Sequence, residues 1–220
     1  MTEGPDTFVA TVSLRVNLAD PHMRAAEGFS RRVRDIEQDH AGEGFGPFWD
    51  EIWHLSIATV FASVASLEAY ANELFFDRAK AFPGYSDTLL DKLWETFEQK
   101  QTLEKFAFAL VLREKPPLDF GASPCQDVSA LIALRHALTH FKPEWDSAPV
   151  RHKQISDRLK HRFNRSPFLS DRHVFPRQWA THAATKWAVV SCLAFAHAFE
   201  TLAGLPAKYE PADASRTFDP

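Results

Sequence analysis

A long apolar stripe at helical spacing, from Phe48 to about Phe82, most restricts the folds open to this chain of 220 residues. Side chains at this spacing recur on one side of a helix. The stripe consists of Ile52, Val60, Val64, Leu67, Tyr70, Leu74 and Phe75. Pro83-Gly84 ends the pattern. A helix of about thirty residues exceeds the ordinary globular length, which leaves room for a kink or break. We expect this segment to be the longest helix of the fold.

Shorter helical patterns occupy most of the remaining chain. The expected helices cover residues 22–39, 87–113 with a break near 99–102, 124–141 and 176–202. Ser86-Asp87 has the composition of a helix start, and Gly204 that of a helix end. Gly42, Gly44, Gly46 and Pro47 mark a loop. The sequence therefore predicts an all-α fold, an up-and-down bundle of four to five helices.

The N-terminal residues 7–18 have a different period. Apolar side chains alternate there with mainly polar ones, and Asp20-Pro21 ends the pattern, which predicts a short β-strand. A lone strand needs a partner, either another short strand or its copy in a second subunit. We therefore expect three parts: an N-terminal strand and charged helix over 1–46, the helical bundle over 47–205, and a frayed tail over 206–220.

Composition narrows the class of protein. An apolar content of 45% with nineteen phenylalanines supports a large core, and a net charge of −4 argues against a general polyanion binder. The start of the chain lacks the basic and apolar stretches of a signal peptide, and no apolar segment reads as a membrane span. Cys125 and Cys192 have no metal-ligand spacing and fit a reducing compartment. A soluble cytoplasmic protein without membrane contact is expected.

The segment Ala130 to Phe141 combines an apolar helical face with polar groups near a helix end. Leu131, Leu134, Leu138 and Phe141 recur on that face, while Lys142-Pro143 stops the helix. The same segment carries the sequence Arg135-His136-x-x-x-His140.

This pattern resembles the motif of the HEPN superfamily: an arginine, a polar residue, and a histidine four to six positions after the arginine. Ser66 to Leu74, which contains Glu68 and Asn72, is similar to the acidic segment of an earlier HEPN helix. The resemblance implies a homodimer with a metal-independent endoribonuclease site between its subunits, and no cofactor. Among members of this kind, toxins and phage-defence effectors are the expected settings, with an antitoxin or regulatory protein as a further partner.

Under this resemblance, Arg135 and His140 are the catalytic candidates. Five helical positions turn the two side chains about 140° apart, and two copies across a twofold axis would bring them together. A histidine can exchange the proton of the 2′-hydroxyl near neutral pH, and an arginine can hold phosphate oxygens. Glu68 or Asn72 could orient either residue, and His136 could bind phosphate or shape the cleft.

Two other interpretations of these residues stay open. Arg135 could pair with Glu68 inside a structural bundle, with His140 at a helix end, which gives a non-catalytic interaction or nucleic-acid-binding module. Alternatively, His136 and His140 have the i, i+4 spacing of a helical metal-ligand pair. Ala137 stands where a His-Glu-x-x-His motif has its glutamate, and no further ligand is evident, so we expect no metal.

The segment 151–177 is the basic part of an otherwise acidic chain, with eight lysines and arginines against two aspartates. It reads as a linker with interleaved Phe163, Phe168 and Phe175, a mixture that suits single-stranded RNA. The alternatives are a solvated surface linker or a loop that docks an acidic partner such as an antitoxin. The predicted RNA-binding residues are Arg151, Lys153, Arg158, Lys160, Arg162 and Arg165.

Overall fold

The computed structural model describes residues 13–209, and within them all regular structure is helical. The helices are α1 (Ala19–Asp39), α2 (Phe48–Phe76), α3 (Arg78–Ala81), α4 (Asp87–Phe97), α5 (Thr102–Leu112), α6 (Cys125–Thr139), α7 (Arg151–Leu159) and α8 (His182–Ala203). Residues Val174–Gln178 form a kinked turn in which Phe175 has extended backbone angles, with φ of −98° and ψ of 139°. The all-α prediction is confirmed. The expected N-terminal strand is wrong for residues 13–18, which form no strand, and its first part lies outside the described residues.

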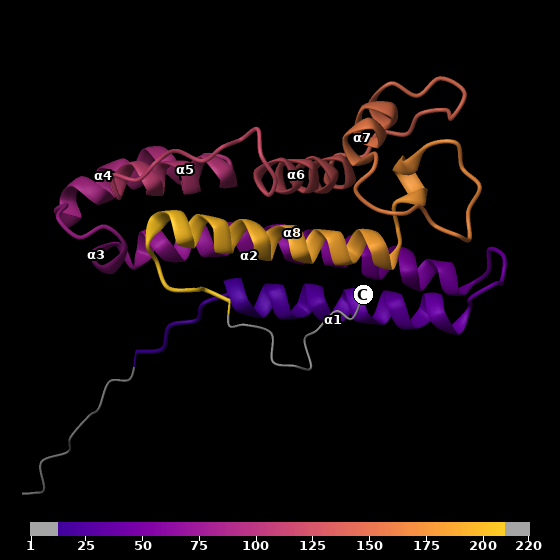
Figure 1. Ribbon diagram of the computed structural model, residues 1–220, viewed down its shortest axis with the longest axis horizontal. Coiled ribbons are helices and arrows are strands. Elements are labelled where there is room, and N and C mark those ends of the chain that lie inside the picture. The colour runs from indigo at the N-terminus through magenta and orange to yellow at the C-terminus, as the bar shows by residue number, and fades with distance from the viewer. Residues whose placement is uncertain (1–12, 210–220) are drawn as a thin grey trace, which may run out of the picture.

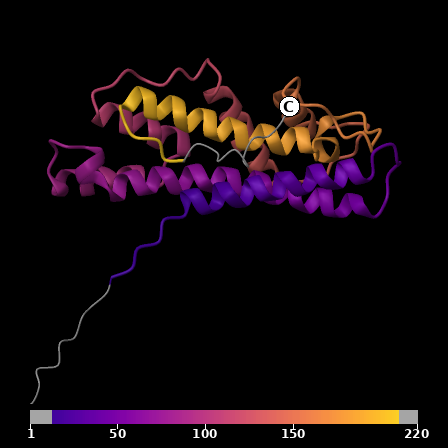
Figure 2. The same cartoon turned by 60° about the horizontal axis from the view of Figure 1, so that its bottom comes forward.

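Helices α2 and α8 form the middle of the fold (Figure 1). α1 packs on one side of them, and α5 and α6 pack on the other. α1 and α2 lie side by side along most of their length, joined by the glycine-rich loop 40–47 (Figure 2). The boundary expected after residue 46 therefore falls between two helices that share one core.

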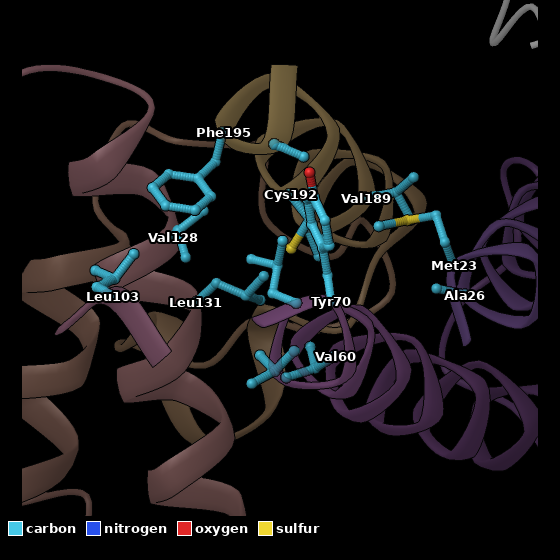
Figure 3. Packing of buried hydrophobic residues seen from close by; sticks show 14 of the residues in the cluster. Met23, Ala26, Val60, Tyr70, Leu103, Val128, Leu131, Val189, Cys192 and Phe195 are labelled. Carbon is cyan, nitrogen blue, oxygen red and sulfur yellow. The ribbon is translucent and has the colours of Figure 1, made fainter. Parts of the chain in front are cut away.

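Side chains from five helices meet in this core (Figure 3). They include Met23 and Ala26 of α1, Val60 and Tyr70 of α2, Leu103 of α5, Val128 and Leu131 of α6, and Val189, Cys192 and Phe195 of α8. Leu131 is completely buried, so the apolar face of α6 points into the core. Truncating a buried leucine to alanine typically costs about 2–5 kcal/mol. The packing of this face thus fixes which side of α6 is left for polar residues.

Helix α2 is apolar around most of its circumference because other helices surround it. Among residues 13–209 it is the one helix long and apolar enough to cross a membrane, with a mean hydropathy of 1.4 over its most apolar window. α1, α5, α6 and α8 all pack against it. A helix covered on several sides has the same composition as a membrane span.

Local signals set several helix ends where the sequence predicts them. The side chain of Ser86 accepts a hydrogen bond from the backbone N–H of Leu89 at the start of α4. At the start of α5, the carboxylate of Glu104 accepts a hydrogen bond from the backbone N–H of Gln101, in the segment that separates α5 from the preceding α4. Gly204 ends α8 with a positive φ of 65°, a conformation that L side chains rarely adopt. The predicted break near 99–102 is confirmed.

The two ends of the described chain meet on α2. The carboxylate of Glu73 accepts hydrogen bonds from the backbone N–H groups of Leu18 and Ala19 at the start of α1, and it also pairs with Lys208. The Tyr209 hydroxyl lies 2.8 Å from the Ser66 hydroxyl. The tail expected to be frayed from residue 206 is therefore packed at least as far as Tyr209.

Candidate functional site

The C-terminal half of helix α6 carries the arginine and the first histidine of the motif, and the second histidine follows the helix. Arg135 is partly buried, while His136 and His140 are exposed. The helix ends at Thr139, and His140 caps it through a hydrogen bond from its backbone N–H to the carbonyl of His136. The predicted helix end before Lys142-Pro143 is thus confirmed, two residues earlier than expected.

The guanidinium of Arg135 contacts the neighbouring helix α2. Its Nη2 donates a hydrogen bond to Oε1 of Glu68, and this oxygen also lies 3.4 Å from the hydroxyl of Thr102. A guanidinium carries five N–H donors, so one bond to Glu68 leaves others for a ligand. Of the two residues proposed to support the motif, Glu68 is the one that reaches Arg135.

Asn72 contacts a lysine instead of a motif residue. Its Oδ1 accepts a hydrogen bond of 3.0 Å from Nζ of Lys105, which is only 7% exposed. Burial lowers the pKa of Lys105 below its ordinary value, against the opposing attraction of Glu68 and Glu98. Lys105 is not among the residues predicted from the sequence. Its position directly before the apolar run Phe106–Leu112 was the signal that could have found it.

These polar groups line a cleft of about 1150 Å³ between α2, α5, α6 and α7. We call it the charged cleft, and its main polar residues are Glu68, Asn72, Lys105, Arg135, His136 and Arg158. The carboxylate of Glu68 and the amide of Asn72, both on α2, lie in the same cleft as the cations Lys105, Arg135 and Arg158. An anionic ligand can bind in such a cleft only where the positive charges exceed the negative charges, or where the cationic groups extend further into the cleft than the carboxylates do.

His140 lies in a second, smaller cavity. This cavity has a volume of about 300 Å³ and lies between the end of α6 and the start of α7; we call it the ring pocket, lined chiefly by His136, His140, Phe141, Arg151, His152 and Phe175. His136 lines both cavities. The ring centroids of His136 and His140 are 4.5 Å apart. Within one protomer, Arg135 and His140 therefore open into adjoining cavities, and His136 stands between them.

The basic segment after α6 is not a linker throughout. Arg151–Leu159 forms helix α7, which buries His152, Ser156 and Leu159 against the rest of the fold. The prediction missed this helix because two of the three buried positions are polar. Arg151 and Arg158, near the two ends of this helix, line different cavities.

The six predicted RNA-binding residues do not form one surface. Arg151 lines the ring pocket and Arg158 the charged cleft. Lys153 pairs with Asp157 at 2.7 Å, and Arg162 pairs with Asp127 of α6. Lys160 and Arg165 line a separate hollow next to α8. The first two are thus near the motif, and the other four are not.

The three phenylalanines expected to stack with RNA bases are structural. Phe168 and Phe175 are buried, at 7% and 1% exposure, and Phe163 packs against Trp187 of α8. Exposed aromatic side chains occur instead between α6 and α7, where Phe141 is 47% and Trp145 is 84% exposed.

In the described part of the chain, no third metal ligand is grouped with the histidine pair. Within residues 13–209, no three histidine, cysteine, aspartate or glutamate side chains are grouped closely enough to hold a metal ion. His136 and His140 alone fall short of the three or four protein ligands of a typical zinc site.

Comparisons with protein-family models, with curated proteins and with solved structures give no match to this chain. The HEPN resemblance therefore depends on the two segments that contain Glu68 and Arg135 and on their contact.

Proposed function

We propose that the protein is a metal-independent endoribonuclease of HEPN type, in which α1, α2, α5, α6 and α8 form the helical bundle. The observation that carries this proposal is the pair of exposed imidazole rings, His136 and His140, 4.5 Å apart beside a cleft that contains Arg135. Two histidines and an arginine supply a base, an acid and a phosphate ligand.

The reaction needs no further reactant. His140 takes the proton of an RNA 2′-hydroxyl, and the freed oxygen attacks the adjacent phosphorus. A bond forms between O2′ and phosphorus while the bond from phosphorus to the 5′-oxygen breaks. We assign the proton that the leaving oxygen gains to His136, because the two rings are neighbours. The products are a 2′,3′-cyclic phosphate and a 5′-hydroxyl.

Arg135 stabilises the charge that builds on the phosphate oxygens, through the N–H groups that Glu68 does not occupy. Lys105 and Arg158 add positive charge on the walls of the same cleft. Asn72 holds Lys105 in place.

A homodimer completes the site in this proposal. Arg135 and His140 of one protomer open into different cavities, which favours an arrangement in which Arg135 of one protomer acts with the His136–His140 pair of its partner. A cytoplasmic toxin or phage-defence effector, controlled by an antitoxin or a regulatory protein, is the setting that the family resemblance favours.

The test is RNA cleavage by the purified protein in EDTA. We expect wild type to cut RNA and both His140→Ala and Arg135→Ala to lose the activity. Two matched controls keep it: His54→Ala removes an exposed histidine of α2 outside the two cavities, and Arg32→Ala breaks another pair between helices, with Glu51. Activity lost on chelation would instead identify a metal enzyme.

One observation favours a second function. Glu68 already neutralises part of the Arg135 charge, as in a structural ion pair. A non-catalytic module of the same fold, which binds RNA or a protein partner, follows from that contact. Wild-type protein that binds RNA but never cuts it, with unchanged binding by His140→Ala, would establish this alternative.

A further inference from the structure

One wall of the ring pocket consists of three packed aromatic rings that have no role in the proposed cleavage step. The ring of Phe141 stacks on that of His152 at 5.2 Å with an interplanar angle of 27°. The edge of His152 meets Phe175 at 5.1 Å and 77°. Three rings, from the segment after α6, from α7 and from the turn before α8, thus form one wall beside His136 and His140.

The inner part of this wall is fixed by its surroundings. His152 is 6% exposed and its Nε2 lies 2.9 Å from the carbonyl oxygen of Lys142, while Phe175 is 1% exposed. Phe141 is 47% exposed, so much of its ring is free to contact a ligand. The pocket volume of about 300 Å³ lies at the small end of the range for small-molecule sites. A flat ring of nucleobase size matches such a wall.

The rim of the pocket is cationic. Lys142 and Arg151 line it together with the histidines. The backbone N–H groups at the start of α7 are not available to an anion, because Glu144 accepts hydrogen bonds from Val150, Arg151 and His152 at 2.9–3.1 Å. A phosphate at this rim must therefore be held by side chains, and Arg151 can do so in a bidentate manner.

We propose that the ring pocket binds one unpaired nucleotide of the RNA, next to the phosphate that is cleaved. The base stacks on Phe141, and Arg151 and Lys142 hold its phosphate. Its place beside the scissile bond rests on the proposed function, because His140 lines the same pocket. This subsite requires single-stranded RNA, since a paired base cannot leave its stack without cost.

The experiment measures binding of adenosine 3′-monophosphate and of inorganic phosphate by calorimetry, with no cleavage involved. We expect the nucleotide to bind more tightly than phosphate. Phe141→Ala should weaken nucleotide binding by about five- to 150-fold, the usual contribution of one stacked base. It should leave phosphate binding unchanged. Phe141→Tyr should retain nucleotide binding, and Arg151→Ala should weaken both ligands.

Phe45→Ala is the matched control, because Phe45 is 59% exposed and lies in the loop between α1 and α2. Circular dichroism should show each variant folded. Equal affinity for phosphate and nucleotide, or no loss in folded Phe141→Ala, would overturn the subsite. If the protein binds the nucleotide through Phe141 but never cuts RNA, the nuclease proposal is wrong and the nucleotide site stands. If the protein cuts RNA but does not bind the nucleotide, the proposed subsite is wrong and the nuclease proposal stands.

Discussion

Arg135 on α6 donates a hydrogen bond to Glu68 on α2, a residue 67 positions earlier in the chain. Their side chains are 28% and 42% exposed, so solvent screens the pair. An exposed ion pair of this kind contributes only about 0–1 kcal/mol to stability. Its larger effect is on geometry, because it fixes where the guanidinium lies at the edge of the charged cleft.

Removal of this contact should affect turnover more than folding. We expect Glu68→Ala to lower the RNA cleavage rate by about ten- to a hundredfold, because a displaced arginine no longer meets the developing charge. Glu68→Gln, which keeps an acceptor oxygen, should lose less. Steady-state kinetics should show the loss in kcat, with KM and the melting temperature nearly unchanged. Faster cleavage by Glu68→Ala would mean that Glu68 restrains Arg135 instead of orienting it.

Mixed dimers test whether the site is shared between protomers. Arg135→Ala and His140→Ala should each be inactive, but an equal mixture should recover up to about a quarter of wild-type activity. Half of randomly formed dimers are mixed, and each mixed dimer has one intact site of two. The measurement is cleavage after the two variants are unfolded and refolded together. A mixture as inactive as its components would show that one protomer holds the whole site.

Glu73 is expected to be more important for stability than any exposed ion pair. Its side chain is 12% exposed and accepts hydrogen bonds from Leu18, Ala19 and Lys208. Glu73→Ala leaves two backbone donors and an ammonium without their acceptor, at a cost of about 3 kcal/mol. Urea unfolding measures the change. Glu95→Ala, which breaks an exposed pair with Lys92, is the control and should change the stability much less than Glu73→Ala does.

Glu200 should make the fold less stable as the pH rises above the acidic range. Burial raises its pKa above the ordinary 4.5, although the backbone N–H of Lys208 bonds to its carboxylate. The folded protein therefore holds this proton more tightly than the unfolded chain. The free energy of unfolding falls as the pH rises from 4.5 through the raised pKa.

Glu200→Gln removes this dependence, since the amide keeps an acceptor oxygen and does not titrate. Relative to wild type, the variant should gain stability as the pH rises above 4.5 through the raised pKa of Glu200, as measured by urea unfolding. Glu114→Gln, at an exposed position, is the control. Parallel pH profiles for wild type and Glu200→Gln would contradict the prediction.

The sequence predicts the features that depend on local chemistry. Ser86 begins α4 because its side chain accepts a hydrogen bond from a nearby backbone N–H, and Gly204 ends α8 because it adopts a positive φ. Helix α7 could not be predicted from local sequence, because its buried face contains the polar residues His152 and Ser156. Their hydrogen-bond partners lie ten or more residues away in the chain. Lys105 could not be predicted for the same reason, since its contact with Asn72 crosses from α5 to α2.

The candidate site shows the same division. Arg135, His136 and His140 are identifiable because they lie within six consecutive residues at the end of α6. The ring pocket is not, because Phe141, His152 and Phe175 come from three segments and only the fold stacks them. The basic residues of 151–165 look alike in the sequence. In the fold, Arg162 forms an ion pair with Asp127, and Lys153 forms one with Asp157.

The two ends of the described chain depend on each other for their packing, because both contact Glu73 and Ser66 of α2 or their neighbours. A protease that cut before Lys208 would remove the ammonium beside Glu73 and the hydroxyl beside Ser66. The first turn of α1 depends on the same carboxylate, so damage to the C-terminal end would loosen the N-terminal helix as well. Fusion partners or tags placed close to either end should therefore be joined through a spacer that leaves Lys208 and Tyr209 in place.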